Sequence, residues 1–420
     1  MNPLTVKDID INTPYPILSR MEFIEKIHKR QEEIKDSLEI HDSGLSVWTK
    51  TPTGKTLSKG CRTCKTGTWQ CLYVGKKCNI DCIYCAQGTR QEKMAEPERP
   101  DLINDAYHIE EVKDMFNDPG AIWAGSNIRG IGYSGGEPFI YLDKVLNLAE
   151  FVSRYHDHIY QWIYTNGLLV TEDKLKSLYD VGVREIRFHI GAANFNKKVL
   201  NNLEMAKGIM DYVNVESPST PELKEFLIDK KGIHRLEAVG VYQINLGELS
   251  TVAVNEMTKF LLGHKRVLEY FQKNQVYVCD SIIGTSVAGR NLSQFYISPT
   301  ISRENTYDIM EYAVENNIDI LINDCSQDAK HIQRLQKNTS EQNADIILKN
   351  LSHDKRSIQK LLKDISERKL NMIRKHKKPR TQDYYMKMLI QDITSKDDKG
   401  YHLNLGELLS SIGDQLDIKF

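Results

Sequence analysis

Residues 78–85 read CNIDCIYC, which places Cys78, Cys82 and Cys85 in the spacing Cys-x3-Cys-x2-Cys. Cysteine thiolates are the usual ligands of iron–sulfur clusters, and a four-iron cluster normally takes four of them. Three thiolates at this spacing therefore predict a cluster with one iron left open, and an open metal position is where a substrate can bind. A structural zinc site or a set of buried thiols is the alternative, but zinc sites usually close with four ligands from paired Cys-x2-Cys elements.

A second informative stretch, GIGYSGGEP, is rich in glycine and occupies residues 130–138. Its glycines have the spacing of a dinucleotide-binding fingerprint, after a predicted strand and before a predicted helix, so an NAD-dependent enzyme is one alternative. That fingerprint expects an acidic residue at the end of the next strand, where it binds the ribose hydroxyls. Here the next strand ends in TNG, with Asn166, which argues against a dinucleotide site.

The two stretches together resemble the signature of the radical S-adenosylmethionine (radical SAM) superfamily, over about residues 70–249. Tyr84 precedes the last cysteine, and GGEP follows about fifty residues later as Gly135, Gly136, Glu137 and Pro138. The resemblance implies that Cys78, Cys82 and Cys85 hold a 4Fe–4S cluster. The amino and carboxylate groups of S-adenosylmethionine would chelate its open iron, with GGEP beside the amino group.

Two later matches to the same superfamily involve single residues. Asn166 in YTNG corresponds to a position near the nucleoside, and Glu216 in VESPSTPE would lie at the mouth of a barrel. Each is as readily explained as a structural residue at a strand end. The chain as a whole is similar to uncharacterised members of the superfamily that have extra N-terminal cysteines.

The resemblance also implies a function. The cluster would reductively cleave S-adenosylmethionine to a 5′-deoxyadenosyl radical, which abstracts hydrogen from a substrate, in an oxygen-sensitive reaction. A peptide or protein side chain is the favoured substrate, with a tRNA or a small metabolite as alternatives, and flavodoxin or ferredoxin would donate the electron. A different class is a non-enzymatic zinc-binding adaptor, because six of the eight cysteines lie between residues 61 and 85.

Three cysteines precede the cluster stretch, Cys61, Cys64 and Cys71, in the spacing Cys-x2-Cys-x6-Cys. A Cys-x2-Cys pair is half of a site for zinc or for an iron–sulfur cluster. We expect these three residues to bind a second metal, with iron–sulfur and zinc both left open. Cys279 or Cys325 could supply a fourth ligand, or the site could stay open to substrate. The alternative is a loop with reduced thiols.

The remaining pattern between residues 70 and 249 alternates short apolar strands with amphipathic helices. Strands are expected within residues 71–75, 128–136, 159–167, 184–191, 211–218 and 234–249, with helices that include 107–116 and 141–155. Six such units favour parallel pairing through right-handed crossovers. We predict an α/β fold, a partial (β/α)6 TIM-like barrel, although periodicity alone does not exclude an open doubly wound sheet.

Three regions follow from this pattern. Residues 1–70 form an N-terminal extension with a helix at 21–40 and a cysteine-bearing loop, 71–295 form the radical SAM partial barrel, and 296–420 form a mostly helical region. The last region contains a basic run at 368–380, which is either a solvated helix face or a binding site for RNA or an acidic peptide.

Composition sets limits on location and partners. The 420 residues are 40% hydrophobic, and 56 Lys plus Arg nearly cancel 57 Asp plus Glu. The overall charge therefore indicates no nucleic acid, membrane or acidic partner, and binding to nucleic acid stays undecided. There is no signal-peptide pattern and no run of about 18 apolar residues. We expect a cytoplasmic protein without membrane contact, in a reducing compartment suited to unpaired cysteines.

Overall fold

The computed structural model describes residues 15–17, 20–82, 85, 128–249, 251–252, 276–281, 294–330, 333, 394–397 and 400–403. Several sequence predictions lie outside these residues. They are Tyr84, the helix at 107–116, the basic run at 368–380 and most of the helical region after residue 330.

A nine-stranded sheet forms the main body of the protein, in the order β2-β3-β13-β9-β8-β7-β6-β5-β4. Its six consecutive parallel strands are β4 (Trp69–Tyr73), β5 (Gly130–Ser134), β6 (Tyr160–Thr165), β7 (Val183–Phe188), β8 (Tyr212–Pro218) and β9 (Gln243–Gly247). Each of these strands pairs with the next of the six, and the sheet formed by the described residues does not close. This order is that of a partial barrel, which confirms the predicted fold class and excludes a doubly wound sheet, whose strand order reverses at a switch point.

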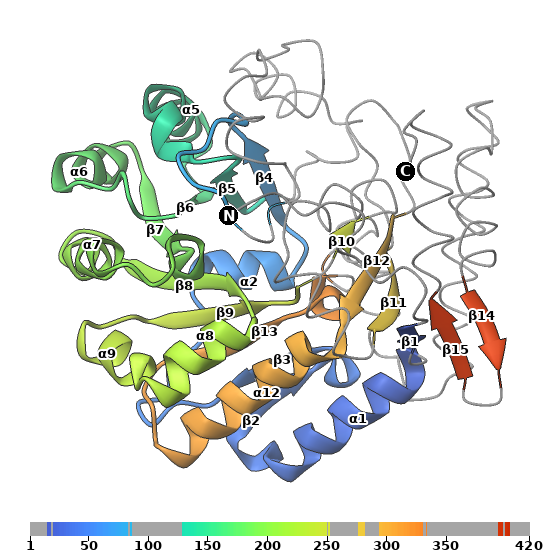
Figure 1. The fold of residues 1–420 in the computed structure, drawn as a ribbon. Helices are drawn as coiled ribbons and strands as arrows, with labels where there is room; N and C mark the ends of the chain where they lie inside the picture. Colours follow the sequence, from blue (N-terminus) through green and yellow to red (C-terminus); the bar gives the residue numbers. More distant parts are fainter. Residues whose placement is uncertain are drawn as a thin grey trace, which may run out of the picture.

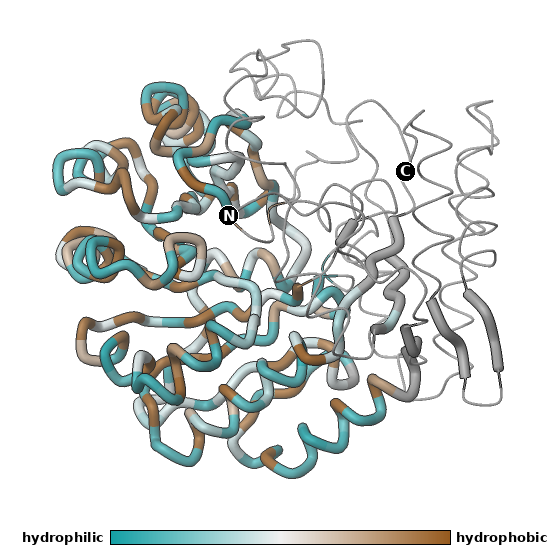
Figure 2. The backbone as a smooth tube through the Cα atoms, viewed as in Figure 1, coloured by the Kyte–Doolittle hydropathy of each residue, from teal (hydrophilic) through white to brown (hydrophobic). Residues whose placement is uncertain are grey.

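The connecting helices cover the outer face of this sheet (Figure 1). They are α5 (Leu142–Tyr155), α6 (Glu172–Asp180), α7 (Lys197–Lys207), α8 (Pro221–Lys224) and α9 (Gly232–Ala238). In α5 the buried residues Val145, Leu148, Ala149 and Val152 recur every three or four positions, so one stripe of the helix faces the sheet. Figure 2 shows the resulting mixture of hydrophobic and hydrophilic positions along the outer helices.

The sheet continues past the boundaries expected at residues 70 and 295. Strand β13 (Leu321–Cys325) pairs in parallel with β9, and the antiparallel strands β3 (Ser46–Thr49) and β2 (Leu38–His41) follow it. The predicted helix at 21–40 is wrong in its second half. Helix α1 (Arg20–Glu33) ends earlier because residues 38–41 pair with β3.

Helix α12 (Thr300–Glu315) packs beside α1, so two segments far apart in the sequence lie in contact. Arg30 of α1 forms ion pairs with Asp308 at 2.7 Å and Glu311 at 2.6 Å. This helix lies within the region 296–420 that was predicted to be mostly helical, although its bounds were not predicted. A six-stranded second sheet lies next to it, in the order β10-β12-β11-β1-β15-β14. These strands span Thr251–Val252, Gln294–Pro299, Val276–Ser281, Tyr15–Ile17, Gly400–Leu403 and Thr394–Asp397.

The expected cysteine-bearing loop is in fact partly a helix, α2 (Lys59–Lys65). The Ser58 side chain accepts a hydrogen bond from the backbone N–H of Cys61 and so begins the helix. Helix α2 lies on the side of the sheet away from α5, α6 and α7 (Figure 1). A Cβ added to Gly60 would come 2.6 Å from Arg187 Nη2 and 2.9 Å from Glu185 Oε2, so α2 packs directly onto the inward face of β7.

Among the described residues, no helix has the length and apolar character needed to cross a bilayer.

Candidate functional site

A cavity of about 550 Å³ opens on the inner face of the nine-stranded sheet, where several parallel strands end. All seven cysteines whose side chains the structure describes line it: Cys61, Cys64, Cys71, Cys78, Cys82, Cys85 and Cys325. The predicted residues Gly135, Gly136, Pro138, Asn166 and Glu216 line the same cavity. Residues that lie far apart in the sequence therefore meet at one site, as expected at the carboxyl ends of barrel strands.

The cluster stretch follows β4 and is held against the GGEP turn by backbone hydrogen bonds. The backbone N–H of Gly136 donates to Gly75 O at 2.7 Å, and that of Glu137 donates to Lys77 O at 2.8 Å. The Lys77 N–H in turn donates to the Tyr141 hydroxyl at 2.8 Å. These hydrogen bonds fix the segment that leads into Cys78.

Both glycines of GGEP are required by this close approach. A Cβ at Gly136 would come 2.2 Å from Lys77 O and 2.3 Å from Lys76 O, and one at Gly135 would come 2.5 Å from Gly75 O. Gly135 also has a φ of +148°. These contacts are with backbone atoms, so a side chain at either position would displace the loop before Cys78.

The third residue of the motif, Glu137, points away from the cavity and is 1% exposed. Its carboxylate accepts hydrogen bonds from Thr165 Oγ1 at 2.8 Å, the Asn166 N–H at 2.8 Å and the Phe139 N–H at 3.2 Å. Burial raises the pKa of Glu137 to about 7, and the three hydrogen bonds oppose this rise only in part. Glu137 therefore joins the ends of β5 and β6, and Pro138 begins the short 3-10 helix Pro138–Tyr141.

Asn166 lies between the two motifs. Its side-chain amide donates to Asn79 Oδ1 at 2.7 Å and lies 3.9 Å from Cys78 Sγ. An amide N–H near a cysteine sulfur is a typical partner of a cluster ligand. The predicted residue thus contacts the cluster stretch itself.

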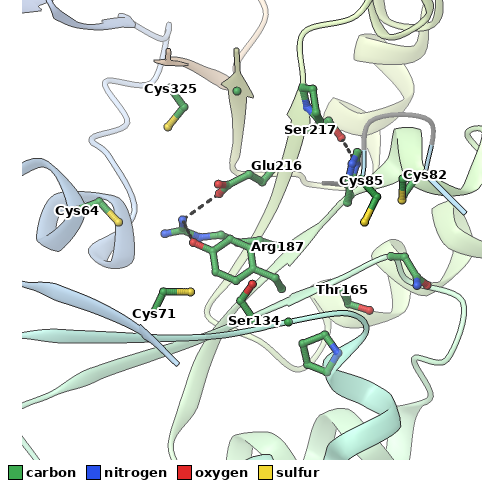
Figure 3. Close-up of a pocket in the computed structure, with 18 of the residues that line it drawn as sticks. Cys64, Cys71, Cys82, Cys85, Ser134, Thr165, Arg187, Glu216, Ser217 and Cys325 are labelled. Carbon is green, nitrogen blue, oxygen red and sulfur yellow. Dashed lines mark hydrogen bonds and ion pairs between the residues drawn. The ribbon is translucent and has the colours of Figure 1, made fainter. Parts of the chain in front are cut away.

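Arg187 occupies the centre of the inner face and was not predicted from the sequence. It is 2% exposed, and its guanidinium contacts Glu185 at 2.7 Å and Glu216 at 2.9 Å. The rings of Trp162 and Tyr164 lie 4.8 and 5.4 Å from its charged carbon. Figure 3 shows the Arg187 and Glu216 pair projecting between the cysteines on the left of the cavity. Glu216 is thus fixed by an ion pair at the cavity wall.

His189 is a second lining residue that sequence reasoning missed. Its Nδ1 lies 2.9 Å from Ser217 Oγ. Burial lowers the pKa of His189 to about 4, because desolvation disfavours the charged imidazolium. The imidazole is therefore neutral at neutral pH and can donate or accept one proton in a hydrogen bond.

The cysteines occupy two sides of the cavity. Figure 3 shows Cys82 and Cys85 on one side and Cys64, Cys71 and Cys325 around Arg187 on the other. Among the described side chains no three Cys, His, Asp or Glu stand close enough to share a single metal ion. The three thiols of the cluster stretch and the glycine cradle beside them fit the donor set of a 4Fe–4S cluster, in which each thiolate binds its own iron.

Comparison with known proteins supports this assignment of the core. Residues 72–214 match the family model described as the radical SAM superfamily. A protein of Methanocaldococcus jannaschii, provisionally described as a glycyl-radical enzyme activating enzyme, is 24% identical over 184 residues, which is 41% of this chain and 45% of the relative. The match thus spans less than half the length of that relative.

Solved structures show weaker likeness. Streptococcus suis SuiB bound to S-adenosylmethionine is 12% identical, with a TM-score of 0.33 over 62% of this chain and 52% of that one. The radical S-adenosylmethionine methyltransferase TsrM of Kitasatospora setae is 11% identical, with a TM-score of 0.34 over 72% of this chain and 67% of that one. The family likeness therefore rests on residues 72–214, which include the cluster stretch and GGEP and match the radical SAM superfamily.

Proposed function

We propose that this protein is a radical SAM enzyme that modifies a peptide or protein. Cys78, Cys82 and Cys85 would hold a 4Fe–4S cluster, and S-adenosylmethionine would bind its fourth iron. The observation that carries the proposal is the single cavity of about 550 Å³ that these cysteines share with Gly135, Gly136 and Asn166. When bound, the cluster supplies the low-potential electron that cleaves S-adenosylmethionine to methionine and a 5′-deoxyadenosyl radical.

The residues of the chain position the cosubstrate for this reaction and form the walls of the cavity. Gly135 and Gly136 let the backbone approach the cluster stretch, so that their peptide groups can face the amino group of S-adenosylmethionine. Glu137 fixes the end of β6 and thereby the side chain of Asn166, which we assign to the cosubstrate side of the cavity. Helix α2 lines one wall of the cavity through Cys61, Cys64 and Lys65.

A protein or peptide substrate is favoured by two observations. The archaeal relative is described as an activating enzyme for a glycyl-radical enzyme, so its own described target is a protein. The cavity wall beyond the cysteines carries Glu216, Lys330 and Gln333, whose polar groups suit peptide amides and side chains. The near balance of 56 basic and 57 acidic residues provides no overall field for RNA, which disfavours a tRNA substrate.

The first test is formation of 5′-deoxyadenosine by protein reconstituted with iron and sulfide without oxygen and reduced with dithionite. We expect product from the wild type and from Cys279→Ala, and none from Cys82→Ala. Cys279→Ala is the matched control because Cys279 lies on β11, in the other sheet. A colourless protein that contains zinc and no iron would instead favour the non-enzymatic adaptor.

The substrate class is tested by deuterium transfer. Deuterium-labelled cell extract is separated into protein, RNA and small-metabolite fractions, and each is added to the reduced enzyme with S-adenosylmethionine. Hydrogen abstraction would carry deuterium into 5′-deoxyadenosine from the protein fraction alone. Transfer from the RNA or metabolite fraction would overturn the choice of substrate and leave the radical chemistry intact.

The reductant in the cell would be a flavodoxin or a ferredoxin of the cytoplasm. Replacing dithionite with a reduced flavodoxin or ferredoxin should preserve 5′-deoxyadenosine formation. If only dithionite supports the reaction, this choice of donor is wrong.

A further inference from the structure

We propose that Cys61, Cys64, Cys71 and Cys325 bind a second iron–sulfur cluster on the wall of the same cavity. This proposal concerns metal content and does not depend on the proposed radical reaction. It selects Cys325 over Cys279 as the fourth ligand and an iron–sulfur cluster over zinc.

The fold brings these four cysteines to one side of the cavity from three separate segments. Cys61 and Cys64 lie three residues apart on α2, which places them on the same face of the helix. Cys71 lies in the middle of β4, and Cys325 ends β13. Figure 3 shows Cys64, Cys71 and Cys325 around Arg187, apart from Cys82 and Cys85.

Cys279 lacks this placement. It lies on β11, which belongs to the six-stranded sheet, whereas Cys325 lies on a strand that pairs with β9 of the barrel. Cys64 lies close enough to both Cys61 and Cys325 for their charges to interact. The backbone topology therefore supplies Cys325 as the fourth thiol.

Amide groups already donate hydrogen bonds to two of the four sulfurs. Gln243 Nε2 lies 3.0 Å from Cys61 Sγ, and Asn323 Nδ2 lies 3.3 Å from Cys325 Sγ. Hydrogen bonds to cysteine sulfur hold cluster ligands in place and tune the reduction potential. Asn166 has the same relation to Cys78 in the first site, at 3.9 Å.

A positive charge is also in place for an anionic thiolate set. Arg187 is 2% exposed, and its charge lowers the pKa of Cys61 and Cys64, in opposition to the burial that raises both. Its ion pairs use Nε and Nη1, and its buried Nη2 makes no hydrogen bond with any described residue. A buried donor without a partner is costly, and thiolates or cluster sulfides near it would offset that cost.

The lack of a tight ligand group among the described residues favours a cluster over a single zinc ion. Zinc binds sulfur at about 2.3 Å, so four tetrahedral ligands lie only about 3.8 Å apart. Within the described part of the chain, no three potential ligands are grouped tightly enough for one ion, and this holds for Cys78, Cys82 and Cys85 as well. A cluster spreads its ligands because each thiolate binds a different iron. Four cysteines would close the site, so it would not bind substrate.

The test is the iron, sulfide and zinc content of protein reconstituted without oxygen. A variant with Cys78, Cys82 and Cys85 all changed to Ala should keep roughly two or four irons with matching sulfide, as for a 2Fe–2S or 4Fe–4S cluster. Zinc alone, or no metal, in this variant would overturn the proposal. Because this variant lacks the first cluster, its metal content is independent of whether the protein cleaves S-adenosylmethionine.

The ligand assignment is tested in the otherwise wild-type chain. Cys61→Ala with Cys64→Ala should retain about four irons, those of the first cluster, which also shows that the variant folds. Cys325→Ala should lower the iron content below that of the wild type, whereas Cys279→Ala should not. A lower iron content in Cys279→Ala than in Cys325→Ala, or an equal iron content in both variants, would overturn the choice of Cys325.

Discussion

The backbone N–H of Asn166 donates a hydrogen bond to the Glu137 carboxylate at 2.8 Å, so the GGEP turn after β5 is joined to the end of β6. This contact is buried, and the same carboxylate accepts two further hydrogen bonds. The glutamate of the motif therefore acts on the cavity by fixing its wall, while the two glycines lie beside the cluster stretch.

Removal of this carboxylate should destabilise the fold. Glu137→Ala leaves three buried donors without their acceptor, and we expect the free energy of unfolding to fall by about 3 kcal/mol or more. Denaturant titration measures the loss. Glu150→Ala is the control, because Glu150 pairs with Arg154 on the surface, and its removal should cost less than about 0.5 kcal/mol. Equal stability of the two variants would contradict the structural role of Glu137.

The raised pKa of Glu137 predicts a pH dependence. The folded protein keeps a proton between the ordinary pKa of 4.5 and the folded value of about 7, so it binds more protons there than the unfolded chain. The free energy of unfolding should therefore fall as the pH rises through this window, by about 2 to 3 kcal/mol between about pH 5 and pH 8. Denaturant titrations should show this slope in the wild type and lose it in Glu137→Gln. An unchanged slope in the variant would assign the proton to another group.

A side chain at Gly136 should impair the first cluster. Its Cβ would lie 2.2 Å from Lys77 O, so Gly136→Ala should shift the segment that leads into Cys78 and lower the iron bound there. Gly208→Ala is the matched control, because Gly208 has a helical φ of −76° and its Cβ would have a nearest contact of 3.5 Å. Iron analysis of both variants in the Cys61→Ala, Cys64→Ala background isolates the first site. Full iron in Gly136→Ala would show that the cradle tolerates a side chain.

The buried ion pairs of Arg187 should be more costly to break than a surface pair. Arg187→Leu leaves Glu185, which is 0% exposed, without its cation, and we expect a loss of about 3 to 5 kcal/mol. Arg154→Leu removes the exposed partner of Glu150 and should cost less than about 0.5 kcal/mol. Thermal and denaturant unfolding provide both values. A loss below about 1 kcal/mol for Arg187→Leu would mean that Glu185 is satisfied by its other hydrogen bonds.

The barrel core could be predicted because its signals are local. The short apolar and aromatic runs of strands such as 160–165 and the stripe of four buried positions in α5 are determined by neighbours within a few residues. The glycines at 135 and 136 and the cysteine spacing are equally local. These features were sufficient for the fold class and for the first cluster stretch.

The features that could not be predicted depend on pairing between segments that are distant in the sequence. Nothing near residue 321 indicates that β13 extends the sheet beside β9, and only this pairing brings Cys325 to the cavity. The second half of the predicted helix at 21–40 failed for the same reason, because its strand pairs with β3.

The inward-facing position of Arg187 could have been predicted from the sequence. In VREIRF the charged residues Glu185 and Arg187 alternate with apolar ones inside a buried strand, which indicates an inward-facing charged pair. The partner Glu216 follows only from the register between β7 and β8.

The most direct test of the central claim is whether S-adenosylmethionine binds the cluster of Cys78, Cys82 and Cys85. The measurement is the electron paramagnetic resonance spectrum of the reduced Cys61→Ala, Cys64→Ala protein, which retains the first site alone, before and after addition of S-adenosylmethionine. Binding at an open iron should shift the signal of the reduced cluster. A signal that stays unchanged at saturating S-adenosylmethionine, in protein with a full complement of about four irons, would contradict the account.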